Sequence, residues 1–140
     1  MKTLDHQAVL DRVYQHFVVE RQPAGFFGAP FYHQWAETGV DQPCAIGLFD
    51  TDCQLADPQF NTDCSVGQLH SGDIQVLLDV FDVDELSAWE MRFLSDIQET
   101  HDHNAEVFAD DPDGFVDQMA VDLDQIGGRY ALRPLELAVA

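Results

Sequence analysis

Basic residues are scarce in this chain of 140 residues. It has six lysines and arginines, of which Lys2 is the only lysine, against 26 acidic residues, so its formal net charge is −20. A surface with this charge repels nucleic-acid phosphates and anionic membranes, which predicts that the protein contacts neither directly. Three explanations of the acidity are open: adaptation to a salty cytoplasm, a surface that meets a basic partner, and metal loading, for which the acids are too scattered.

Cysteine is nearly as scarce, and its spacing matches no metal or redox motif. Cys44, Cys53 and Cys64 form an odd set without a CxxC pair, which argues against a zinc knuckle or a thioredoxin-type site. The polar and acidic first residues do not fit a secretory signal peptide. No apolar run approaches the roughly 18 residues of a membrane span. We therefore expect a cytoplasmic protein with reduced thiols and no membrane contact.

Several other patterns are missing too. No phosphate-binding loop, Rossmann glycine pattern or GxSxG occurs, so we expect no cofactor. No segment shows the alternation of apolar and polar residues that is typical of a strand.

Four segments instead carry the spacing of amphipathic helices. We predict helices over residues 4–20, 71–81, 84–102 and 112–126, the last opened by Asp111-Pro112 and ended by Gly127-Gly128. The expected fold is all-α: a single small domain of about four helices over residues 1–140. A long aromatic-rich loop follows the first helix, and its residues 26–35 are expected to cover the core. The tail, 133–140, is expected to fray.

Two of the predicted helices carry well-defined apolar stripes that should form the core. The stripe of the third helix consists of Leu86, Trp89, Phe93, Leu94 and Ile97, and that of the last consists of Phe115, Val116, Met119, Leu123 and Ile126.

The histidines in "ETHDHNAE" raise the question of a metal site. His101 lies four residues after Ile97, on the apolar stripe, whereas His103 falls about 200° around the helix from His101. Two metal ligands on one helix face need a spacing of three or four residues, so we expect no metal site. We expect His101 to be a histidine at the edge of the core that closes the end of its helix.

A catalytic role for His101 is the alternative. Cys44 follows Pro43 at a possible helix start, where a thiol is acidified, so a Cys44–His101 dyad could serve a hydrolase or transferase. Asp102, being adjacent to His101 in the helix, is expected to point elsewhere and to orient the imidazole poorly. Buried cysteine is the more common situation.

The last helix carries the densest acidic surface. Asp113, Asp117 and Asp124 fall within about 40° of one another, opposite the apolar stripe, and further acids lie nearby. We name this set the acidic surface: Asp110, Asp111, Asp113, Asp117 and Asp124. It could imitate nucleic-acid phosphates, or it could be an ordinary solvated helix face.

Four short motifs occur in an order that resembles a known group of proteins. The stretches are HFVVERQ (16–22), CAIGLF (44–49), LSDIQETHD (94–102) and YAL (130–132). This order resembles a loosely defined group of small proteins encoded by bacteria and their phages, and the likeness covers about residues 9–132. Members often have a second cysteine where this chain has Leu48 or Phe49, and the 24–40 insert is longer than expected.

The resemblance implies that Cys44, Gln98, His101 and Asp102 belong together, but it implies no activity. Gln98 and His101 lie three residues apart on one helix and could reach the backbone of the Cys-Ala-x-Gly segment. Buried amides and imidazoles bonded to backbone specify folds more often than they do chemistry. We therefore predict that Gln98, His101 and Asp102 form an internal polar latch.

These patterns favour a non-enzymatic, acidic binding or regulatory protein of bacterial or phage origin. The more specific hypothesis is a DNA mimic that inhibits a nucleic-acid-binding complex, with a protein partner that has a basic surface. The alternatives are a Cys44–His101 hydrolase or transferase and a generic helical protein from a salt-adapted organism.

Overall fold

A computed structural model of the protein describes residues 2–22, 45–50 and 74–132. Within these ranges the chain forms four α-helices, a π-helical turn and a 3-10 turn, and no β-strand. The predicted all-α class is therefore confirmed. The aromatic residues 26–35, the three cysteines and the tail 133–140 lie outside the described residues.

The first helix, α1 (His6–Tyr14), begins at an acidic cap. Asp5 has an extended backbone, and its carboxylate accepts a hydrogen bond from the Ala8 N–H at 3.0 Å. The chain continues as a π-helical turn, η1 (Gln15–Val19), and leaves the helix at Arg21, whose φ of 52° is left-handed. The predicted first helix is thus present, but no sequence pattern indicated its widened last turn.

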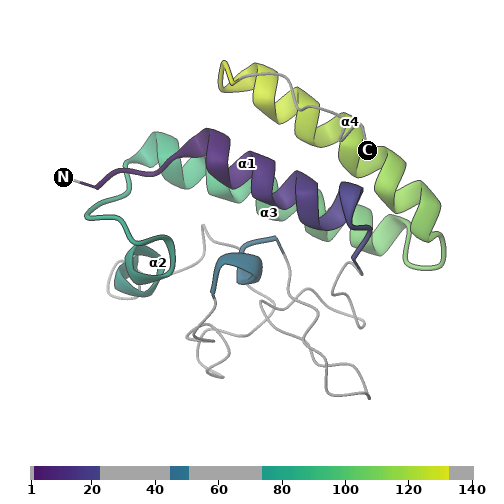
Figure 1. The fold of residues 1–140 in the computed structure, drawn as a ribbon, viewed down its shortest axis with the longest axis horizontal. Coiled ribbons are helices and arrows are strands. Elements are labelled where there is room, and N and C mark those ends of the chain that lie inside the picture. Colours follow the sequence, from purple (N-terminus) through teal and green to yellow (C-terminus); the bar gives the residue numbers. More distant parts are fainter. Residues whose placement is uncertain (1, 23–44, 51–73, 133–140) are drawn as a thin grey trace.

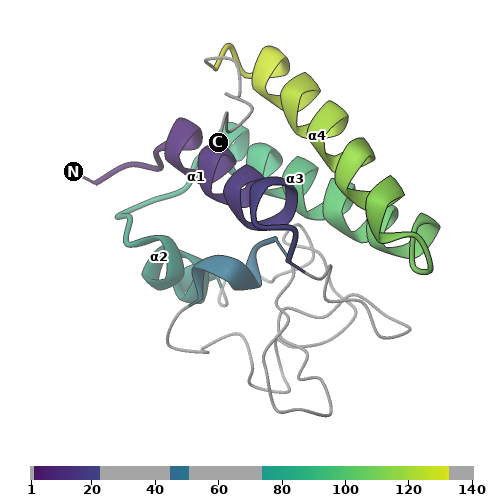
Figure 2. The ribbon, with the colours of Figure 1, turned by 45° about the vertical axis from the view of Figure 1, so that its right-hand side comes forward.

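A short helix, α2 (Ile74–Phe81), packs against the segment 45–50. The ring of Phe81 lies 5.1 Å from the ring of Phe49, at the end of the 3-10 turn η2 (Gly47–Phe49). Both elements lie on one side of α1 in the two ribbon views (Figures 1 and 2). Residues 71–73, where the sequence predicted this helix to begin, lie outside the described residues.

The longest helix, α3 (Ala88–Val107), is shifted from its predicted range of 84–102. It starts at a capping box, in which Ser87 Oγ accepts from the Glu90 N–H and the Glu90 carboxylate accepts from the Ser87 N–H. The predicted end was wrong because the polar run after residue 102 contains neither proline nor glycine. Trp89, predicted on the buried stripe, lies in the first turn and is 54% exposed, with its ring 4.7 Å from that of Tyr130.

The last helix, α4 (Pro112–Arg129), starts where the sequence predicted. Asp111 Oδ1 accepts from the Gly114 N–H at 3.0 Å, and Pro112 takes the first helical position, where its missing N–H costs nothing. The predicted stop at Gly127-Gly128 was wrong, since the helix runs through both residues. A Cβ on Gly127 would lie 3.2 Å from Leu10 Cδ2, so this glycine lets α4 approach α1 closely.

The helices α1, α3 and α4 pack side by side and share one core (Figures 1 and 2). α1 runs parallel to α3, because the rings of His6 and Phe93 meet at one end and those of Phe17 and His101 at the other. α4 returns antiparallel along α3. The predicted stripe of α4 is entirely buried, and Phe93, Leu94 and Ile97 of α3 are fully buried.

The described helices were also compared with the dimensions of a bilayer. None of them is both long enough and apolar enough to cross a membrane.

Candidate functional site

The His101 ring lies inside the protein. Its side chain is 0% exposed, and its ring centroid lies 5.0 Å from that of Phe17 and 6.2 Å from that of Phe115. The inward orientation agrees with the position of His101 on the apolar stripe. The expectation that His101 closes the helix end was wrong, since α3 continues to Val107. An interaction with the C-terminal helix dipole, which acts within the last turn, is therefore excluded.

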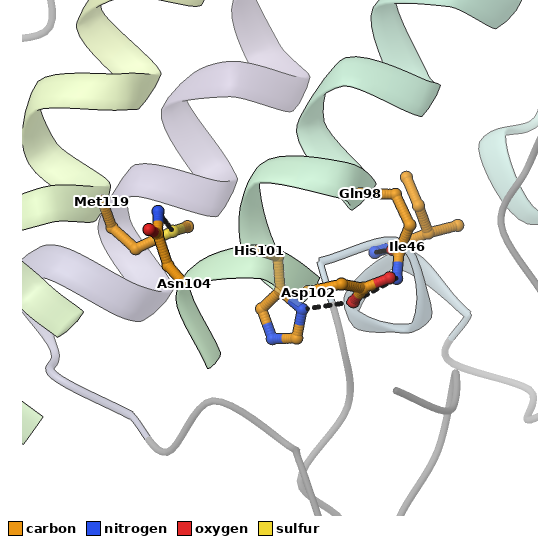
Figure 3. Close-up of polar contacts among 6 residues, drawn as sticks. All are labelled: Ile46, Gln98, His101, Asp102, Asn104 and Met119. Carbon is orange, nitrogen blue, oxygen red and sulfur yellow. Dashed lines mark hydrogen bonds and ion pairs between the residues drawn. The ribbon is translucent and has the colours of Figure 1, made fainter. Parts of the chain in front are cut away.

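Asp102 contacts the histidine that precedes it. His101 Nδ1 lies 2.8 Å from Asp102 Oδ1, and in the tautomer with hydrogen on Nδ1 the imidazole donates a hydrogen bond to this carboxyl oxygen (Figure 3). The expectation that Asp102 points away from His101 was wrong. Adjacent Cβ atoms diverge by about 100° on a helix, but a short carboxylate can turn back across that angle.

Gln98 joins this pair to the distant segment 45–50. Its Oε1 accepts from the Ile46 N–H at 3.1 Å, and its Nε2 donates to both Asp102 oxygens at 2.8 and 3.0 Å. Gln98 is 1% exposed, so these bonds satisfy groups that have little access to water. Figure 3 shows the resulting chain of contacts, from Ile46 through Gln98 and Asp102 to His101. We call the three side chains Gln98, His101 and Asp102 the polar latch.

Asn104 is a buried polar residue that the sequence reasoning missed. It is 1% exposed, and its Nδ2 lies 2.9 Å from Asp122 Oδ2. The same Nδ2 lies 3.5 Å from Met119 Sδ (Figure 3). Its position three residues after His101 puts it on the same helix face, which was the available signal. Asn104 therefore links α3 to α4 about one helical turn after His101.

The π-helical turn η1 places a second histidine near the latch. The His16 ring lies 4.6 Å from the Phe17 ring, which in turn contacts His101. Burial lowers the pKa of His16 from its ordinary value of 6.5; Arg12 and His101 also lower it, and Glu20 raises it. His16 is half-buried within this turn, which accounts for the part that burial plays in the shift.

This pKa shift predicts a pH-dependent stability. With a lowered pKa in the folded state, the unfolded chain binds more protons than the folded one below pH 6.5. The contribution of His16 is therefore complete above 6.5 and is lost as the pH falls through the folded-state pKa. Urea midpoints measured between about pH 7.5 and 5 should fall less steeply for His16→Gln than for the wild type. The exposed control His103→Gln should follow the wild type, and equal slopes in all three proteins would contradict the prediction.

The metal candidates His101 and His103 do not lie together. His103 is exposed, whereas His101 is buried, so the two do not form a chelating pair. Among residues 2–22, 45–50 and 74–132, no group of three His, Cys, Asp or Glu side chains could hold a metal ion. Cys44 lies outside the described residues.

The members of the acidic surface are all exposed, and they differ in their contacts. Asp111 caps α4, and Asp113 pairs with Arg21 of the turn after η1. The other three members make no hydrogen bond or ion pair with any residue that the structure describes; they are Asp110, Asp117 and Asp124. Capping and pairing account for part of this surface, and three carboxylates are left without such a role.

The basic residues of the chain do little to neutralise these carboxylates. Of the five basic residues within the described ranges, four pair with acids of the same chain. The pairs are Lys2–Asp82, Arg12–Glu20, Arg21–Asp113 and Arg129–Asp96. Of the described basic residues, only Arg92 is left without an ion pair, so the described part of the molecule presents an acidic exterior with few unpaired cations.

A groove of about 330 Å³ runs between α3 and α4. Its α3 wall includes Glu99, Thr100 and His103, its α4 wall includes Asp122, Gln125 and Ile126, and the pair Asp96–Arg129 stands at one end. Tyr130 also donates to Asp96 at 2.7 Å; burial and this hydrogen bond raise the pKa of Tyr130 to about 12, which keeps it a donor.

The chain was also compared with known proteins. No family model, curated protein or solved structure matches it.

Proposed function

We propose that the protein is a non-enzymatic binding or regulatory protein whose acidic surface meets a basic surface of a protein partner. The supporting observation is the exposed acidic surface of α4 and the turn before it, where the carboxylates of Asp110, Asp117 and Asp124 make no ion pair with the described basic residues. On a chain of net charge −20, such a face attracts basic surfaces over roughly a Debye length, about 8–10 Å at physiological salt.

The spacing along α4 supports the sharper proposal that the surface imitates nucleic acid. At about 1.5 Å per residue, Asp117 and Asp124, unpaired among the described residues, are separated by about 10.5 Å along the axis. Phosphates of one DNA strand recur every 3.4 Å or so along the duplex, so three steps cover about 10 Å. A basic groove that binds phosphates at this interval could therefore bind α4, which would make the protein an inhibitor of a nucleic-acid-binding complex.

A pair of charge-matched double variants tests the proposal. The test variant is Asp117→Asn/Asp124→Asn, which leaves Asp111 as cap and Asp113 paired with Arg21. The control is Asp79→Asn/Glu85→Gln, two exposed acids around the end of α2 with the same change in net charge. Partners captured by the wild type are identified, and their affinity is measured against salt concentration for all three proteins.

We expect wild-type affinity to fall with salt, and the test variant to bind about 5- to 30-fold more weakly than the control, since two carboxylates each lose about 0.5–1 kcal/mol. Thermal stability of the test variant should stay equal or rise, because neighbouring like charges are removed. Equal losses in both double variants, or no partner whose affinity depends on salt, would refute the proposal.

One observation favours the Cys44–His101 enzyme as a second candidate: Asp102 contacts His101 Nδ1 at 2.8 Å, as the third member of a catalytic triad would. The complete burial of the imidazole opposes it, because a general base must reach substrate. The rate of Cys44 alkylation distinguishes the two proposals. An activated thiol reacts faster than free cysteine at neutral pH and loses that advantage in His101→Gln.

The third candidate is a generic helical protein of a salt-adapted organism. It predicts that proteins encoded beside this one are equally acidic, whereas a dedicated acidic inhibitor would stand out from its neighbours in charge.

A further inference from the structure

We propose that the groove between α3 and α4 binds an arginine side chain of the basic partner, with Asp122 as its main acceptor. This inference rests on the proposed function and adds a specific binding position on another face of α4, since Asp122 lies about 160° around the helix from Asp124. The groove volume of about 330 Å³ lies near the lower limit of ligand pockets, a size that suits one long side chain.

Asp122 is a carboxylate held in place by neutral donors. Its Oδ2 accepts from the Nδ2 of Asn104, and its Oδ1 accepts from the Nε2 of Gln118, both at 2.9 Å. Asn104 is 1% exposed, so its amide is fixed by the core rather than by solvent. Two amides orient the carboxylate without neutralising it, and no cation among the described residues pairs with it.

The remaining hydrogen-bonding capacity of Asp122 suits a guanidinium. Each carboxylate oxygen can accept about two hydrogen bonds, and each Asp122 oxygen uses one within the protein. Arginine presents five donors in a planar fork that matches a carboxylate, whereas lysine presents a compact charge that stays more strongly hydrated. An oriented carboxylate with one free position on each oxygen therefore favours arginine.

The rest of the groove supports the same occupant. Arg129 Nη1 lies 3.0 Å from Asp96 Oδ2, so the Arg129 guanidinium already has a carboxylate partner. Glu99 on the α3 wall adds a second carboxylate without an ion pair in the described residues. Thr100 offers a hydroxyl acceptor, and Ile126 gives the wall an apolar part against which the methylene stem of an arginine can lie. A cation with an apolar stem fits this combination better than an anion or a purely apolar group.

The test uses two small probes that differ in charge. Nα-acetyl-arginine amide and the neutral Nα-acetyl-citrulline amide are titrated into ¹⁵N-labelled full-length protein. We expect the arginine probe to shift the backbone amides of Glu99, Thr100 and Asp122 with saturation, and the citrulline probe to leave them unchanged. Shifts of equal size from both probes, or an arginine effect spread evenly over all acidic segments, would overturn the inference.

Variants separate this site from general attraction to negative charge. Glu99→Gln should weaken the arginine probe about two- to fivefold, as expected for one partly exposed ion pair, and Asp122→Asn at least as much. The exposed control Glu85→Gln should bind like the wild type. If Glu99→Gln and Glu85→Gln have the same effect, the groove is not the binding position. The Asp117/Asp124 double variant then still decides whether the acidic surface binds a partner.

Discussion

The variant Gln98→Leu is expected to lose about 2–3 kcal/mol of its free energy of unfolding. The leucine fills most of the space of the amide, so the loss comes from the hydrogen bonds of the amide, although Asp102 keeps its contact with His101 Nδ1. The Ile46 N–H loses its acceptor, and the Asp102 carboxylate loses the donor to both of its oxygens. Burying one such group unsatisfied costs about 1–3 kcal/mol, and at least one of them is buried here.

A matched glutamine elsewhere provides the control. Gln75 also donates to an aspartate four residues later, Asp79, at 3.1 Å, but this pair is exposed on α2. Gln75→Leu should change the free energy of unfolding by less than about 0.5 kcal/mol, because water replaces the lost bond. Both values come from urea unfolding followed by circular dichroism. Similar small losses in the two variants would show that the polar latch contributes nothing to stability.

The features that the sequence predicted correctly depend on residues that lie close together in the chain. Asp111 followed by Pro112 fixes the start of α4 because a cap and a proline at the first position act within one turn. The stripe from Phe115 to Ile126 follows from helical periodicity alone, and all of its members are buried. Periodicity also put Gln98 and His101 on one face, from which Gln98 does reach the backbone of Ile46.

The features that the sequence did not predict depend on contacts between distant segments. Gly127 stays helical where α4 packs on α1 at Leu10, so tertiary packing overrides the low helix propensity of glycine there. Arg21 pairs with Asp113, which lies 92 positions later in the chain, and no local sequence pattern around either residue predicts this pair. The groove exists only because α3 and α4 pack antiparallel, so its lining could not be assembled before that packing was known.

Interior and exterior polar groups have different roles in this molecule. The buried amides of Asn104 and Gln98 are satisfied by a carboxylate and by a backbone N–H, whereas His6 Nε2 is buried without a hydrogen-bond partner among the described residues. The exterior carries most of the negative charge, and self-repulsion among those carboxylates opposes compactness. Stability variants should therefore cluster in the core and the polar latch, and binding variants on α4 and in the groove.

The variant His101→Ala is expected to lose about 2–4 kcal/mol of its free energy of unfolding. Removing a fully buried ring leaves a cavity against Phe17 and Phe115 and takes the Nδ1 contact from Asp102. The control His103→Ala, two residues along the same helix and exposed, should change stability by less than about 0.5 kcal/mol. Urea unfolding at pH 7.5 measures both. A loss no larger than that of the control would contradict a bracing role for His101.

A double-mutant cycle tests whether His101 and Gln98 act together. Both contact the Asp102 carboxylate, so the two substitutions should not add: the double variant His101→Ala/Gln98→Leu should differ from the sum by about 0.5–3 kcal/mol. Additive losses would mean that the two side chains stabilise the core separately and that Asp102 does not couple them. Salt-dependent partner binding, measured well below the midpoint of unfolding, should survive His101→Ala, because the buried ring lies away from the exposed carboxylates of α4. Loss of binding in a folded His101→Ala protein would instead place the histidine at the functional surface.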